Sequence, residues 1–192
     1  MTYYKAFRRD GLTLHGNPSW PLPTDKGPGK WMEVKGPLVE CKRGLHIMRE
    51  SHLAYWPGWI LFEVEAEGEM LDLEDKVVCR RARLVRRVET WTEAVLFAWL
   101  RDVVKRARDK ATVPAAARAA AEAARAVDYA FITTVDYAAN DVRCAAAWAV
   151  AAVDAHADAY GYARVDERAW QTEQMLKYIQ PTGPLGFFSA EE

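Results

Sequence analysis

The chain changes character near residue 90, and this break constrains the fold more than any other feature. Before it lie most of the glycines and prolines, together with runs in which apolar and polar residues alternate as in half-buried strands. After it the sequence is rich in alanine and reads as helix almost to residue 180. Because strands and helices are segregated, we predict an α+β fold, with a small, mainly antiparallel sheet packed with an Ala-rich helical region. We expect a domain over 1–90, helices over 91–180 and a tail over 181–192.

Two long runs form the clearest strand pair. WILFEVEAEGEM and KVVCRRARLVRRV each alternate between apolar and charged residues, the first acidic and the second basic. The predicted apolar faces hold Ile60, Phe62, Val64 and Ala66 in the first run and Val78, Ala82, Leu84 and Val88 in the second. Glutamate and arginine can then pair across the ladder, each pair contributing roughly 0.2–1 kcal/mol.

Shorter elements complete the prediction. TYYKAF and KWMEVKG are strand candidates, and RESHLAYW is a short helical turn that ends before Pro57. In the C-terminal part a capping box, Thr90 followed by Glu93, predicts the start of the first helix. A second helix begins at Pro114, a third covers roughly 135–163, and VDERAWQTEQMLKYI forms a fourth.

Charge and composition narrow the partners and the compartment. The formal net charge of −1 argues against nucleic acid as the main partner. The cysteines, Cys41, Cys79 and Cys144, are far apart and lack C-x-x-C spacing, which predicts the reducing cytoplasm rather than a disulfide framework. The N-terminal stretch is not apolar and no run reaches membrane-spanning length, so we expect neither a signal peptide nor a membrane partner.

The stretch ECKRGLHIM, Glu40 to Met48, concentrates reactive residue types. Gly44 predicts a tight turn or a close backbone approach that fixes where His46 points. Cys41, His46 and His52 could converge on a metal ion, but three ligands on one loop and turn lack the usual zinc spacing, so we predict no metal site. A Cys–His nucleophile pair lacks an orienting acid. A structural His46 and a ligand-binding His46 stay open as alternatives.

Arginines dominate a second candidate site. The basic run from Arg80 to Arg87, together with Arg8, Arg9, Lys42 and Arg43, could bind a phosphate group or an acidic protein surface. The alternative is that these arginines pair with the glutamates of the facing strand. The candidate ligand- or partner-binding residues are Arg43, His46, Arg81 and Arg83.

Several short motifs follow one another along the N-terminal part. They are Tyr4-Lys5-Ala6-Phe7, the Cys-x-x-Gly-Leu-His of Cys41 to His46, the Phe-Glu-Val-Glu of Phe62 to Glu65, and the Lys-Val-Val of Lys76 to Val78. In order and spacing, residues 3–90 resemble a domain of unknown function found in phages and prophage-bearing bacteria. Ala-rich helices ending near Trp170 are similar to those that often follow it. The resemblance implies a mobile-element context and no defined activity.

An opening strand with a basic residue, a later Gly-Leu-His, a short helix and a Glu-rich strand also follow one another. This order is similar to that of ADP-ribosyltransferase-type domains, in which a basic residue or His grips NAD and a late-strand Glu activates the nucleophile. The clean Ser-Thr-Ser strand of those domains is missing here. Carried over, the resemblance implies NAD as cofactor and the following catalytic candidates: Lys5, His46 and one of Glu63, Glu65, Glu67 or Glu69.

We therefore expect a non-catalytic binding or interaction module without a cofactor. It would act on a host or phage protein, in the host cytoplasm or in a virion, with a homodimer as a further partner. The alternative is an ADP-ribosyltransferase-like or NAD- or nucleotide-binding enzyme. The two hypotheses differ in geometry. An enzyme needs Lys5, His46 and a free Glu in one pocket, whereas a binding module has Glu63 and Glu65 paired with Arg81 and Arg83.

Overall fold

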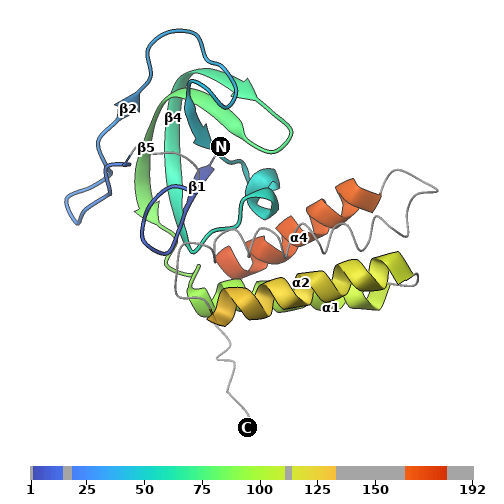
Figure 1. Ribbon diagram of the computed structural model, residues 1–192. Helices are drawn as coiled ribbons and strands as arrows, with labels where there is room; N and C mark the ends of the chain where they lie inside the picture. Colours follow the sequence, from blue (N-terminus) through green and yellow to red (C-terminus); the bar gives the residue numbers. More distant parts are fainter. Residues whose placement is uncertain (1, 15–18, 111–113, 133–162, 181–192) are drawn as a thin grey trace.

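A computed structural model describes residues 2–14, 19–110, 114–132 and 163–180. The elements are β1 (Tyr3–Phe7), β2 (Met32–Glu33), β3 (Leu45–Ile47), the 3-10 helix η1 (Glu50–Tyr55), β4 (Ile60–Asp72), β5 (Val77–Arg87), α1 (Glu93–Lys110), α2 (Pro114–Ile132) and α4 (Ala163–Ile179). Figure 1 shows the sheet and the long helices on separate sides of the molecule, which confirms the α+β prediction. The predicted tail and nearly all of the predicted third helix lie outside the described residues.

The strands form an antiparallel sheet that closes on itself. β4 pairs with β1 and with β5, and the other edge of β5 pairs with β2 and β3. An isolated bridge joins Tyr4 of β1 to Met48, just after β3, through two N–H···O=C bonds of 2.8 Å. The pairings β1–β4–β5–β3–β1 therefore make a closed circuit, as in a small barrel.

The β4–β5 hairpin carries two irregularities in register, one between Glu63 and Val64 and one between Glu67 and Met70. A bulge changes which face the following side chains occupy. The single apolar face predicted for the second run is therefore wrong in part. Leu84 packs in a cluster within the sheet, whereas Val88 packs in the cluster that meets the helices.

Two hydrophobic cores result from this arrangement. The inner cluster lies between strands of the sheet and contains Phe7, Trp20, Leu45, Ile47, Phe62, Val64, Val77, Cys79, Ala82 and Leu84. The larger cluster joins the other face of the sheet to η1 and the helices, with Tyr4 and Leu61 on one side and Leu100 and Met175 on the other. The larger cluster is thus a core that the sheet shares with the helices. Within it, α4 lies between η1 and α1 (Figure 1).

Hydrogen bonds fix the helices to the N-terminal part. The indole of Trp91 donates to the Gly58 carbonyl at 2.9 Å, and the hydroxyl of Thr90 donates to the Ile179 carbonyl at 2.8 Å. The predicted capping box at Thr90 is therefore wrong. Thr92 is the residue whose hydroxyl accepts an amide of the first turn, from Val95 at 3.2 Å.

Within the described part of the chain, no helix combines the length and the apolar character needed to cross a membrane.

Candidate functional site

A cavity of about 440 Å³ lies beside β1, β3 and the end of η1. This volume falls within the range of small-molecule sites. The residues that line it are Lys5, Ala6, Thr13, Leu14, Trp20, Cys41, Lys42, Gly44, Leu45, His46, Ile47, Met48, Trp56 and Lys76. The described lining therefore contains three lysines, one histidine and two tryptophans but no carboxylate. It is a positively charged pocket with apolar walls.

Gly44 allows β3 to lie flush on β5. Its φ is +147°, and a Cβ at this position would lie 2.1 Å from Val78 Cγ1. Only glycine combines this backbone conformation with this close approach. The next residues pair with β5, and Leu45 and Ile47 enter the inner cluster. His46 lies between them in β3, and by strand alternation its side chain points to the opposite face.

The His46 imidazole is held in the cavity lining with an unused hydrogen-bonding atom. Its Nε2 is buried and has no hydrogen-bond partner among the described residues. Burial lowers the pKa of His46, and the nearby cations of Lys5 and Lys76 lower it further. The ring is therefore neutral near pH 7, and it has one nitrogen available to a ligand.

Lys5 places a cation among apolar side chains. It lies on the same face of β1 as Tyr3 and Phe7, both of which pack on the inner cluster. Its Nζ donates to the His46 carbonyl at 2.9 Å and lies 5.5 Å from the centroid of the Trp20 ring. Within the described residues Lys5 forms no ion pair. Burial lowers the pKa of Lys5 to about 8.

Replacing this lysine should stabilise the protein. The depressed pKa of Lys5 means that the folded state loses a proton more readily than the unfolded state, so the charged amine costs roughly 3 kcal/mol below pH 8. That cost fades as the pH rises from about 8 towards the unfolded value of 10.5. We expect Lys5→Met to raise the free energy of unfolding by about 2 kcal/mol at pH 7, since an apolar side chain replaces a half-buried charge that has no anionic partner.

Urea titrations of both proteins at pH 7 and pH 10 measure this difference. The gain should shrink at the higher pH. A Lys5→Met protein that is less stable than the parent at pH 7 would show that the amine stabilises the fold.

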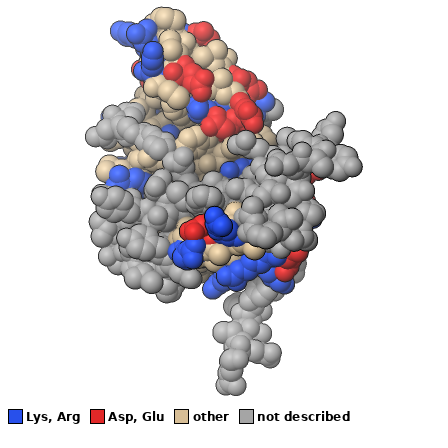
Figure 2. Space-filling model, turned by 45° about the vertical axis from the view of Figure 1, so that its right-hand side comes forward, with Lys and Arg blue, Asp and Glu red and all other residues tan. Residues whose placement is uncertain are grey.

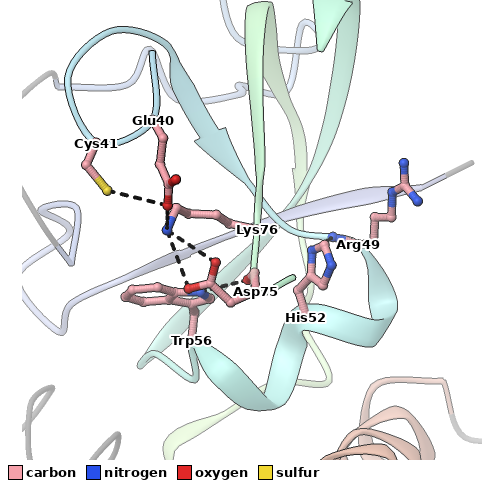
Figure 3. Close-up of polar contacts among 7 residues, drawn as sticks. All are labelled: Glu40, Cys41, Arg49, His52, Trp56, Asp75 and Lys76. Carbon is pink, nitrogen blue, oxygen red and sulfur yellow. Dashed lines mark hydrogen bonds and ion pairs between the residues drawn. The ribbon is translucent and has the colours of Figure 1, made fainter. Parts of the chain in front are cut away.

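The rim of the cavity is a network centred on Lys76 (Figure 3). Its Nζ lies 3.2 Å from Glu40 Oε1 and 3.2 Å from Asp75 Oδ1, and 5.6 Å from the centroid of the Trp56 ring. The Trp56 indole donates to the Asp75 carbonyl at 2.8 Å. The two carboxylates neutralise Lys76 and tie the tip of the 39–43 hairpin to the turn between β4 and β5.

Cys41, His46 and His52, the three residues considered as metal ligands, lie in different places and make different contacts. Cys41 occupies the hairpin tip with a φ of +56°, and its sulfur lies 4.0 Å from Glu40 Oε1. His52 is buried on η1, where its Nδ1 accepts the Arg49 amide at 3.3 Å (Figure 3). Within the described ranges, no group of three His, Cys, Asp or Glu side chains is placed to hold a metal ion.

The glutamates of β4 are all engaged by arginines of β5. Glu63 pairs with Arg86 at 2.7 Å and Glu65 with Arg83 at 2.5 Å. The remaining pairs are Glu67 with Arg81 and Glu69 with Arg80. The expected Glu–Arg ladder therefore exists, but the bulge beside Glu63 gives it Arg86 as its partner. Figure 2 shows acidic and basic side chains next to one another on the described surface.

The candidate binding residues fall in separate places. Arg81 and Arg83 stack on the Trp31 ring at 4.3 and 4.6 Å, outside the cavity lining. Arg43 is exposed and also lies outside that lining. The structure brings Lys5 and His46 together in one cavity, and it places Glu63 and Glu65 elsewhere, in ion pairs.

Sequence reasoning did not name Trp20, Trp56 or Lys76 as candidate site residues, although all three line the cavity. Trp20 comes from the Pro-rich loop, Trp56 from the end of η1 and Lys76 from the turn before β5. Lys42, named only with the basic run, lies at the other turn of the rim. The positions of the two tryptophans could have indicated the cavity. Large aromatic side chains in a loop or a turn usually pack against other parts of the protein or against a ligand.

Comparison with known proteins gives one match. No curated protein and no solved structure is matched by the chain. A family model described as "Domain of unknown function (DUF7666)" matches residues 1–95. This range includes all five strands, η1 and every described residue of the cavity lining. The resemblance over residues 3–90 is thus confirmed at the level of a domain of unknown function, and the N-terminal half of the chain, residues 1–95, is a DUF7666 domain.

Proposed function

We propose that this protein is a non-catalytic binding module and that the cavity between β1, β3 and η1 is its binding site. The observation that carries the proposal is the composition of the described lining, which offers cations, an imidazole and aromatic rings but none of the glutamates that the enzyme alternative needs to activate a nucleophile. The glutamates that could have supplied one are held in ion pairs on β5.

One observation favours the alternative, an ADP-ribosyltransferase-like or NAD-cleaving enzyme. Lys5 and His46, the residues expected to grip NAD, do line the same cavity. Glu63 and Glu65 would have to leave Arg86 and Arg83 to take part. The phage or prophage origin, the host or phage protein partner and the virion location stay predictions that follow from the resemblance. The homodimer stays a prediction from the Ala-rich helices, and the cytoplasmic location a prediction from the spacing of the cysteines.

The binding site can be tested by blocking it. Cys41 is exposed at the cavity rim and Cys79 is buried, so a maleimide should react with Cys41 in a Cys144→Ala background. We expect small aromatic fragments, detected by ligand-observed NMR, to bind the unmodified protein and to be displaced by a bulky group on Cys41. Fragments that bind equally well after modification, or no binding fragments at all, would contradict the proposed site.

The absence of catalysis is tested separately by incubation with NAD. We expect no release of nicotinamide or ADP-ribose above the rate without protein. Nicotinamide release that is lost in Glu65→Gln or Glu63→Gln would favour the enzyme instead.

A further inference from the structure

We infer that the cavity recognises a small molecule in which an anionic group, a carboxylate or a phosphate, is attached to an aromatic body, with Lys5 as the counter-charge. This inference rests on the proposed binding function and gives the chemical class of its ligand.

Lys5 is a half-buried cation that lacks an anion. Of the three N–H donors of its ammonium group, one is used by the His46 carbonyl at 2.9 Å, and the Trp20 ring lies 5.5 Å away. No carboxylate of the described residues pairs with it. Buried charges in proteins are usually paired, because an unpaired one is expensive to desolvate. An anion entering the cavity would supply the missing partner.

Lys76 shows the contrast within the same lining. Its ammonium already has Glu40 and Asp75 at 3.2 Å each, so it is neutralised before any ligand arrives. Lys42 lies at the hairpin tip and, like Lys5, has no ion pair among the described residues. The lining therefore carries an excess of positive charge, concentrated on Lys5 at depth and on Lys42 near the rim.

His46 offers a further donor in the cavity lining, on the face of β3 opposite to that of Leu45 and Ile47. Its Nε2 is buried without a partner in the described part of the chain, and the neutral ring can carry a hydrogen there. The lining thus offers an ammonium with free N–H donors at Lys5 and an unpartnered imidazole nitrogen at His46.

The apolar walls of the cavity indicate which kind of molecule carries the anionic group. Apart from the charged groups, the lining is mainly apolar and aromatic, with Leu14, Trp20, Leu45, Ile47, Met48 and Trp56 as its larger apolar side chains. A free inorganic ion would leave these surfaces and most of the 440 Å³ unused. A flat aromatic body fills such a space and packs on indole rings. The ligand therefore needs both parts, the anion and the ring.

Isothermal titration calorimetry with four probes tests both parts. The probes are 1-naphthoate, 1-naphthyl phosphate, the uncharged 1-naphthamide and inorganic phosphate. We expect the two naphthyl anions to bind at least about 10-fold more tightly than the other two probes, as expected for a hydrogen-bonded charge pair. The Lys5→Met protein should lose about 10-fold or more in affinity for 1-naphthoate. Lys105→Met, the same change at an exposed position on α1, should leave the affinity unchanged.

The outcomes separate this inference from the proposed function. If 1-naphthamide binds as tightly as 1-naphthoate and is displaced by modification of Cys41, the cavity is a binding site but the anion requirement is wrong. If inorganic phosphate binds as tightly as 1-naphthyl phosphate, the requirement for an aromatic body is wrong. If no probe and no fragment binds, both proposals fail.

The pH dependence of 1-naphthoate binding gives a second, independent readout. The groups facing the Lys5 amine are the His46 carbonyl on β3, the Trp20 ring and, on β5, Cys79, whose pKa burial raises to about 12. Lys5 should therefore be the group that titrates, and affinity should fall as the pH rises through about 8. The carboxylate of the probe stays ionised throughout. An affinity that is flat from pH 7 to 9.5 would overturn the role of Lys5.

Discussion

Replacing Trp91 with alanine should lower the free energy of unfolding by about 4 kcal/mol, because a large core side chain is lost and leaves a cavity. Trp91 is fully buried where the sheet meets the helices, and its ring packs edge-on against Trp99 with centroids 6.2 Å apart. The indole also donates to the Gly58 carbonyl at 2.9 Å, which the substitution leaves buried without this donor. Urea denaturation followed by circular dichroism measures the loss.

Two further variants separate the contributions. Trp31→Ala removes the same side chain from the surface, where it stacks on Arg81 and Arg83, and should cost less than about 1 kcal/mol. Trp91→Phe keeps a ring in the core and removes the indole donor, so it should fall between the two. A Trp91→Ala protein as stable as Trp31→Ala would show that the sheet and the helices do not share the core described above.

Replacing Gly44 with alanine should lower the free energy of unfolding by about 3 kcal/mol. The first reason is the φ of +147°, which disfavours any residue with a Cβ. The second is steric, since the added Cβ would lie 2.1 Å from Val78 Cγ1 and would push β3 away from β5. The same displacement moves His46 and Leu45, so the variant should also bind aromatic anions more weakly.

Gly27 provides a matched control for Gly44. Its φ is +134°, close to that of Gly44, but a Cβ there would meet nothing within 4 Å. Gly27→Ala should therefore cost only the backbone term, about 1 kcal/mol. The difference between the two variants in urea midpoint isolates the steric contact between β3 and β5. Equal effects would mean that this contact is absent and that β3 is held in another way.

Local sequence patterns were enough to predict much of the fold. The alternation in the two long runs predicted β4 and β5, and their opposite charges predicted the Glu–Arg ladder that the structure contains. The register could not be predicted, because a bulge depends on how two strands fit along their whole length. One consequence is that Glu63 pairs with Arg86 rather than with Arg81 or Arg83.

Helix boundaries show the same limit. Thr90 and Glu93 have the spacing of a capping box, yet Thr90 bonds to the end of α4 and Thr92 accepts the amide of Val95 instead. The competing partner, Ile179, is 89 residues away in the chain, so no local pattern could have indicated it. A tertiary contact outweighed the local preference.

The candidate site was only partly accessible to sequence reasoning. Gly44 and His46 stood out because a glycine before a histidine suggests a fixed ring, and the structure explains the glycine by the contact with Val78. Lys5 entered through a resemblance in element order. The cavity itself depends on the bridge between Tyr4 and Met48, which brings β1 beside β3. This closure brings the lining residues of β1, such as Lys5, beside those of β3.

The location of the ligand is the central claim, and chemical-shift mapping tests it most directly. The full-length, isotope-labelled protein is titrated with 1-naphthoate while the backbone and indole N–H signals are recorded. We predict that the shifted signals belong to Lys5, His46, Trp20 and Trp56, whereas those of Trp31, Arg81 and Arg83 stay in place. Shifts gathered at Trp31 and its two arginines, or no shifts at all, would contradict the account.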